Sequence, residues 1–122
     1  MYHRLVHRAL LALLALLVGA CASPACADDG DRRLARDVEI LSTRDGQLAE
    51  DAQARVLAAG RGAIVMLETG LYTAAAPGRR RIVKTLAALH LGETRPILAH
   101  LAQADPDPDV RAAAAAALAS PR

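Results

Sequence analysis

The sequence contains no Phe or Trp and only two Tyr among its 122 residues. Proteins that bind single-stranded nucleic acids stack bases on aromatic side chains, so this scarcity argues against that class. The hydrophobic core must be built from Leu, Val, Ile and Ala, which bury less area per side chain than aromatic rings. We therefore expect a domain of modest stability, unless a partner covers part of its surface.

The segment 1–27 has the pattern of an export signal. Arg4 and Arg8 provide positive charge, an unbroken run of Leu, Ala and Val follows over 9–18, and small residues come next. The run is much shorter than the ~20 residues of a membrane-spanning helix. It is also apolar on every side, unlike the amphipathic first helix of a folded domain. We expect a signal-peptide helix that sends the protein to the bacterial periplasm or out of the cell.

Two ways of processing this signal remain open. Ala25-Cys26-Ala27 before Asp28 fits the small-x-small rule of signal peptidase, and cleavage there would release a soluble protein. The segment 17–21, LVGAC, instead resembles the end of a bacterial lipoprotein signal over 1–20, after which Cys21 would carry the lipid anchor. Cleavage after Ala27 removes both cysteines of the chain, so no disulfide would support the mature fold.

The net charge gives no indication of a nucleic-acid partner. Of 15 basic residues, Arg4 and Arg8 leave with the signal, and the remaining 13 equal the 13 acidic residues, all of which lie at Asp28 or later. Loss of 27 of the 122 residues leaves 95, enough for one domain. A neutral mature domain has no overall attraction for a phosphate backbone.

After a charged, flexible lead-in over 28–33, apolar residues recur at helical spacing through the rest of the chain. Turns rich in Gly, Pro and Asp divide it into six helices, and they lie at 45–46, 60–62, 77–78, 92 and 105–107. Gly92 is expected to cap the helix over 79–91. Asp107, Pro108 and Asp109 predict a strong start for the last helix. Six helices with short connections predict three antiparallel pairs.

The helical pattern repeats. The segment 83–91 opens with Val and a basic residue and closes with Leu, and 110–118 does the same 27 positions later. The apolar triplet 65–67 likewise precedes the triplet 96–98 by 31 positions. A period of roughly 30 residues is typical of helical solenoids, in which each helix pair buries its apolar face only against a neighbouring pair.

Two segments carry a resemblance to a known family. DPDPDVRAAAAAAL at 105–118 and GETRPILAHL at 92–101 resemble the helix-loop-helix units of HEAT-like repeat proteins, including the short repeats of bilin lyases. The resemblance covers 35–118 and implies an all-α, HEAT-like α-solenoid over 34–120. It implies little about function, because this repeat serves scaffolds, chaperones and some enzymes. Export, small size and the lack of a Cys near a pocket argue against bilin lyase activity.

The first candidate site is a cationic cluster at a helix start. It consists of Arg79, Arg80, Arg81 and Lys84. Positive charge is unfavourable at this end of the helix dipole, which favours a functional reason for the cluster. Together with the free amides of the first turn it would bind phosphate, an acidic lipid headgroup or an acidic partner. The alternative is a solvated face neutralised by nearby acids such as Glu68 or Asp105.

The second candidate site is a metal centre formed by His90, Glu93 and His100. Imidazole and carboxylate suit zinc or iron, and such a centre would make the protein a small metal-dependent enzyme. Metal-dependent hydroxylases built from HEAT-like repeats resemble one another through adjacent His-Glu pairs, which this chain lacks. Two partly covered histidines are therefore the simpler interpretation.

The expected function is that of an exported, non-catalytic protein-binding or scaffold module without a cofactor. A row of stacked helices offers an extended surface for a protein or peptide partner. The chain has no Gly-x-Ser-x-Gly or phosphate-binding loop motif. The alternatives are the metal-dependent enzyme and the anion or headgroup binder, and membrane contact is expected only through a lipid at Cys21. Leu98 is expected to be a core residue.

Overall fold

The computed structural model describes residues 24–121, and it describes side chains from residue 28 onward. The predicted signal run and Cys21 lie outside the described residues. The chain divides between Asp31 and Arg32 into two units, and the second unit contains the helical domain.

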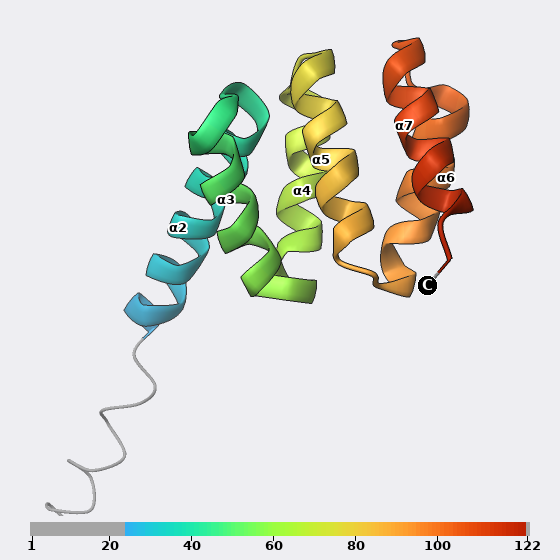
Figure 1. The fold of residues 1–122 in the computed structure, drawn as a ribbon. Coiled ribbons are helices and arrows are strands. Elements are labelled where there is room, and N and C mark those ends of the chain that lie inside the picture. The colour runs from blue at the N-terminus through green and yellow to red at the C-terminus, as the bar shows by residue number, and fades with distance from the viewer. Residues whose placement is uncertain (1–23, 122) are drawn as a thin grey trace, which may run out of the picture. The chain divides into compact units, whose positions relative to one another are not determined.

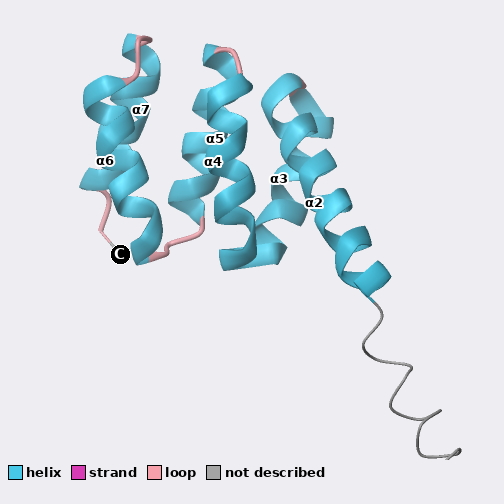
Figure 2. Ribbon diagram, turned by 180° about the vertical axis from the view of Figure 1, so that it is seen from behind, coloured by secondary structure: helices cyan, strands magenta, loops and turns pink. Residues whose placement is uncertain are grey.

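The described residues form helices and no strands, which confirms the all-α prediction. The helices are connected by short turns, and Figures 1 and 2 show them from opposite sides. Their bounds are α2 (Pro24–Thr43), α3 (Gly46–Ala59), η1 (Gly60–Ala63), α4 (Ile64–Thr73), α5 (Ala76–Ala88), η2 (Gly92–Thr94), α6 (Arg95–Ala104) and α7 (Pro108–Ala119). Among these described helices, none is both long enough and apolar enough to span a bilayer.

The start of α7 follows from its local sequence, as predicted. The Asp107 side chain accepts hydrogen bonds from the backbone amides of Asp109 at 2.9 Å and Val110 at 3.1 Å. Pro108 occupies the first helical turn, where its missing N–H costs no hydrogen bond. Proline has the same position in α5 and α6. The helices α5, α6 and α7 therefore begin where proline restricts the backbone.

Two helix ends differ from the prediction. The lead-in expected at 28–33 is helical, because α2 already begins at Pro24 and runs through the charged residues. At the end of α5, the residue in the left-handed conformation is His90, with φ of 52°, and not Gly92. The His90 amide donates a hydrogen bond to the Ala87 carbonyl at 3.2 Å. The left-handed turn thus comes two residues earlier than the glycine that was expected to form it.

The core is aliphatic and continuous along the second unit. Its fully enclosed side chains include Leu41, Val56, Leu67, Ile82, Leu86 and Val110. Leu98, the predicted core residue, is 3% exposed, which confirms its position. Ala114 is enclosed as well, so the alanine-rich helix α7 contributes to the core mainly through small side chains.

Two glycines permit close approaches between helices. A Cβ at Gly78 would collide with the carbonyl oxygen of Ser42, so the start of α5 can lie against the end of α2 only with glycine there. A Cβ at Gly70 would lie 3.1 Å from Val38 Cγ1 and 3.2 Å from Ile82 Cδ1. Glycine inside a helix costs about 1 kcal/mol relative to Ala. At Gly70 this cost is offset by the packing of α4 against α2 and α5.

Within the second unit the helices lie in adjacent pairs, α2 with α3, α4 with α5, and α6 with α7 (Figures 1 and 2). The first pair is joined by an ion pair between Arg55 Nε and Asp37 Oδ1 at 2.8 Å. In the middle pair, α5 contacts α3, α4, α6 and α7. Because α5 contacts helices of all three pairs, residues near its start can connect neighbouring pairs.

Candidate functional site

The first arginine of the predicted cluster forms a buried ion pair. Arg79 Nε donates to Asp105 Oδ2 at 2.9 Å, and Arg79 Nη2 donates to Asp105 Oδ1 at 3.1 Å. A third hydrogen bond runs from Arg79 Nη1 to the Ala74 carbonyl at 2.9 Å. The Asp105 side chain is only 2% exposed and that of Arg79 17%. This two-pronged geometry is the strong form of an Arg–carboxylate contact.

Asp105 also organises the loop before α7. Its Oδ1 accepts the backbone amide of Asp107 at 2.9 Å, and its carbonyl accepts Arg111 Nη1 at 2.6 Å. Burial by itself raises the pKa of the Asp105 carboxyl. The hydrogen bonds from Arg79 and from the Asp107 amide, together with the charges of Arg79 and Arg111, outweigh burial and hold that pKa below its usual range. Asp105 is therefore a charged structural group at neutral pH.

The other two arginines of the cluster contact different partners. Arg81 Nε donates to the Leu41 carbonyl at 2.7 Å, and Arg81 Nη2 donates to the Ser42 carbonyl at 3.3 Å. Both acceptors lie near the end of α2, where free carbonyls attract a cation. Arg80 Nη1 lies 3.7 Å from Asp109 Oδ2, and both side chains are well exposed.

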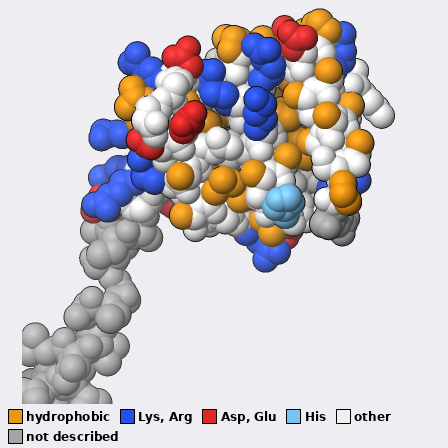
Figure 3. Space-filling view, viewed as in Figure 1, with side chains coloured by type: hydrophobic (Ala, Val, Ile, Leu, Met, Phe, Trp, Pro, Cys, Tyr) orange, Lys and Arg blue, Asp and Glu red, His pale blue; other side chains and the backbone are white. Residues whose placement is uncertain are grey.

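The predicted anion site is therefore not assembled, although Lys and Arg side chains gather over α5 in Figure 3. Consecutive helical residues point about 100° apart. For this reason Arg79 reaches the loop before α7, whereas Arg81 reaches the end of α2. Lys84 is exposed and has no ion pair with any described residue. The interpretation of the arginines as charges answered by nearby acids is correct for Arg79, whose partner is Asp105.

The predicted metal site is not formed either. His90 lines a small pocket at the end of α5, whereas His100 lines a separate groove between α4 and α6. Glu93 forms an ion pair with Arg61 Nε at 2.7 Å. From residue 28 to residue 121, no three His, Cys, Asp or Glu side chains lie close enough together to hold a metal ion. The sequence spacing of the three residues does not become proximity in space, because His90 and His100 line different hollows and Glu93 pairs with Arg61.

The groove between α4 and α6 is the most promising binding feature. It has a volume of about 390 Å³, within the usual range for ligand sites. Its apolar surface comes from Leu71, Ile97 and Leu101, and its polar groups include Glu68 and His100. The buried pair of Arg79 and Asp105 also lines the groove.

Tyr72 stands on the edge of this groove and is 88% exposed. The carboxylate of Glu68 lies one helical turn earlier on α4, and it has no ion pair with any described residue. Tyrosine is enriched at the centre of protein interfaces, where its ring supplies contact area with little loss of rotamer freedom. The pairing of a free aromatic ring with a free carboxylate distinguishes this groove from the rest of the described surface.

A second hollow lies on the other side of α4, against α2. Its volume is about 220 Å³, and Val38, Met66 and Gly70 are among the residues that line it. The missing side chain of Gly70 helps to form it, because α4 and α2 approach closely there. Hollows therefore flank α4 on both sides, and the first helices of the three pairs form a surface with more than one depression.

Sequence reasoning did not select Tyr72 or Glu68 as site residues. The sequence marks Tyr72 only as the one aromatic after the predicted signal, and Glu68 only as one of the acids expected to neutralise the arginines. Their spacing of four residues was the available signal, since it places both on one helix face. That this face borders a groove depends on how α6 packs beside α4, which local sequence does not specify.

The groove offers a hydrophobic floor, an aromatic edge, an imidazole and a free carboxylate. These groups can hold an apolar side chain and attract a cationic one, and the surface is open enough for a polypeptide segment to lie in it. The predicted lipidation residue Cys21 lies outside the described residues. No family model, no curated protein and no solved structure matches this chain.

Proposed function

We propose that the helix pairs are units of a short HEAT-like α-solenoid and that the exported protein is a non-catalytic protein-binding module. The repeated spacing of about 30 residues and the short connections between helices favour this fold. The sharing of one aliphatic core by all the pairs supports it too, because solenoid units bury their apolar faces against each other.

The observation that carries the binding proposal is Tyr72, 88% exposed beside the groove between α4 and α6. Exposing a large aromatic ring without a partner forfeits the free energy that its burial would provide. Tyrosine residues are enriched among the few side chains that dominate binding energy at protein interfaces. Tyr72 therefore has the properties of an anchor that a partner protein would cover.

The charges of the groove indicate which side chains a bound partner would place in it. Glu68 is a free carboxylate, whereas Arg79 and Asp105 neutralise one another. A bound segment is therefore expected to place Lys or Arg opposite Glu68 and an apolar side chain over Leu71 and Ile97. We propose that the occupant is an apolar and basic segment of another protein, bound as an extended chain or a helix.

A phage-displayed library of random peptides tests this proposal. The library should enrich sequences in which Leu, Ile or Phe lies near Lys or Arg, and their dissociation constants can be measured by fluorescence anisotropy. Tyr72→Ala should weaken binding about 30-fold, as expected for an anchor residue that contributes about 2 kcal/mol. Glu68→Lys should weaken it as well and reverse its dependence on salt, because attraction to the basic peptide becomes repulsion.

Leu48→Ala is the matched control, because Leu48 is also a large exposed apolar residue, 62% exposed, but it lies on α3 outside the groove. Its affinity for the selected peptides should equal that of the wild type. Equal loss in Tyr72→Ala and Leu48→Ala would show general hydrophobic adhesion and contradict a specific groove. Enrichment of acidic peptides would contradict the proposed role of Glu68.

Export is proposed from the signal pattern of 1–27, and the intact mass of the protein from each cellular fraction tests it. Cleavage after Ala27 gives a soluble chain that begins at Asp28. Lipoprotein processing gives a membrane-bound chain that begins at Cys21 with the added mass of its acyl groups. Recovery of the full 122-residue chain from the cytoplasm would contradict export.

A further inference from the structure

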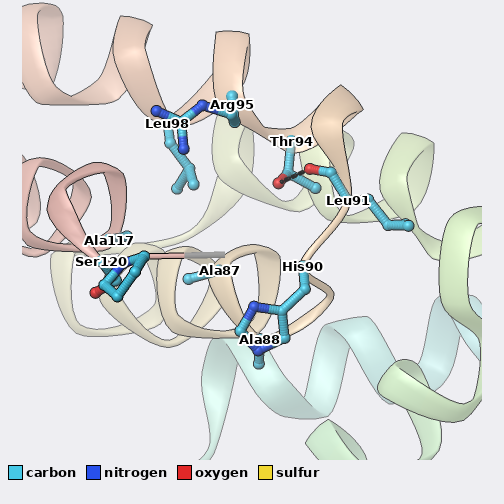
Figure 4. A pocket seen from close by; sticks show the side chains of 10 residues that line it. Ala87, Ala88, His90, Leu91, Thr94, Arg95, Leu98, Ala117 and Ser120 are labelled. Carbon is cyan, nitrogen blue, oxygen red and sulfur yellow. Dashed lines mark hydrogen bonds between the residues drawn. The ribbon is translucent and has the colours of Figure 1, made fainter.

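A second pocket, separate from the groove, lies where the end of α5, the start of α6 and the end of α7 meet (Figure 4). Its volume is about 200 Å³, below the ~300–1,000 Å³ of pockets for drug-sized ligands. Its wall is largely apolar and includes Ala87, Leu91, Leu98 and Ala117. The pocket is therefore suited to a small molecule with an apolar body.

The ionisable residues that line this pocket are all basic. Arg95 and His90 line it, together with the polar side chains of Thr94 and Ser120, and no acidic residue is among its lining residues. Figure 4 shows Arg95 on one side of the pocket, along α6, and His90 on the opposite side, with Ser120 on a third. A molecule in the pocket would meet polar groups at its edge and alkyl groups elsewhere.

Arg95 is a half-buried residue, and its guanidinium has no hydrogen bond or ion pair with any residue of 28–121. Glu93, the nearest acid in sequence, is paired instead with Arg61 at 2.7 Å. In this respect Arg95 differs from Arg79, Arg80 and Arg81, each of which has a partner. A guanidinium that lines a pocket without a counter-charge favours binding of an anion, most strongly a carboxylate with matching planar geometry.

The position of His90 adds a second observation. Its backbone has φ of 52°, a left-handed conformation that glycine adopts without steric cost and that histidine adopts less readily. Glycine would satisfy this helix end at least as well, and Gly92 is only two residues away. The imidazole at this position supplies the pocket with a donor that glycine would not provide.

We propose that this pocket binds a small carboxylate with an apolar body. Arg95 holds the carboxylate through charge-assisted hydrogen bonds, His90 donates a further hydrogen bond from the opposite side, and the alkyl wall around Leu98 covers the rest of the molecule. The pocket shares no lining residue with the groove that contains Tyr72, so this proposal does not depend on the proposed protein-binding function.

Titration of the purified protein with benzoate, followed by ¹H–¹⁵N correlation spectra, tests the proposal. Benzoate should cause saturable shifts of the backbone amides of Leu91, Thr94, Arg95 and Ser120. Benzamide, which has the same shape without the charge, should bind about tenfold more weakly, because a charge-assisted hydrogen bond is lost. Inorganic phosphate, an anion without an apolar body, should also bind more weakly than benzoate.

Three variants test which residues are responsible for benzoate binding. Arg95→Gln should weaken benzoate binding about tenfold, and His90→Asn, which tolerates the left-handed backbone, should weaken it to a smaller extent. Arg80→Gln is the matched control, because Arg80 lies outside the pocket and has only a long, exposed ion pair. Its affinity for benzoate should be that of the wild type.

The proposal is overturned by any of four results. Benzoate produces no saturable shift, benzamide binds as tightly as benzoate, phosphate binds as tightly as benzoate, or Arg80→Gln reduces binding as much as Arg95→Gln. Unchanged spectra of the variants without ligand confirm that they are folded, so a loss of shifts reports on binding.

Discussion

At the scale of single residues, arginine has three different roles in this protein. Arg79 neutralises a buried carboxylate, Arg81 donates to the free carbonyls at the end of α2, and Arg95 lines a pocket without a counter-charge. The sequence groups the first two in one cluster and gives no reason to single out the third. The role of each arginine therefore depends on its surroundings, because only the fold determines which guanidinium lies near a hydrogen-bond acceptor.

The Arg79–Asp105 pair makes stability depend on pH. The folded state lowers the pKa of Asp105, so the unfolded state binds the proton more readily. The stabilisation is complete above the ordinary Asp pKa of about 3.9 and is lost as the pH falls below it toward the pKa of the folded state. We expect Asp105→Asn to cost about 3 kcal/mol at pH 7, because it leaves Arg79 without a counter-charge.

Urea unfolding at a series of pH values between neutral and about pH 3 measures both effects. The wild type should lose more of its unfolding free energy over the acidic part of this range than Asp105→Asn does. Asp109→Asn is the control, since Asp109 is exposed and lies 3.7 Å from its partner Arg80, and it should retain the pH dependence of the wild type. An identical acid profile in Asp105→Asn and the wild type would rule out this role for Asp105.

At the scale of helices, the sequence was sufficient to predict helix starts where interactions within a few residues determine the backbone conformation. The cap at Asp107 and the proline starts follow from hydrogen bonding and fixed φ angles within a few residues, and both were predictable. The predicted start of the first repeat helix at Leu34 was too late, because charged residues without an apolar stripe gave no helical signal. The left-handed conformation of His90 was not predicted, because glycine is the usual residue at such a helix end.

The groove and the pocket were less predictable than the helices that form them. Both are lined by residues of more than one helix, so periodicity along one helix does not reveal them. The Gly70 contact illustrates the difficulty, since an unfavourable helix residue is explained only by Val38 and Ile82 beside it. Candidate sites drawn from charge spacing alone consequently joined His90 and His100, which line different cavities.

At the scale of the whole domain, α5 connects the helix pairs. Arg81 hydrogen-bonds to the end of α2 on one side, and Arg79 pairs with the loop before α7 on the other. Leu86 and Ile82 of the same helix are enclosed in the shared core. Because the pairs share these contacts and each has few apolar side chains of its own, none of them is expected to be stable alone.

Leu98→Ala tests whether the domain unfolds as one unit. Leu98 is 3% exposed in the last pair, and its truncation should cost about 2–5 kcal/mol, a large share of the stability of a small domain. If the pairs unfold together, amide hydrogen exchange in α5 of the middle pair and in α3 of the first pair should accelerate as much as in α7. Far-UV circular dichroism in urea should show a single transition at a lower midpoint.

Leu48→Ala, at an exposed site on α3, should leave both measurements unchanged. Faster exchange confined to α6 and α7 would mean that the last pair opens independently, and the coupling through α5 would then be too weak to make the domain cooperative.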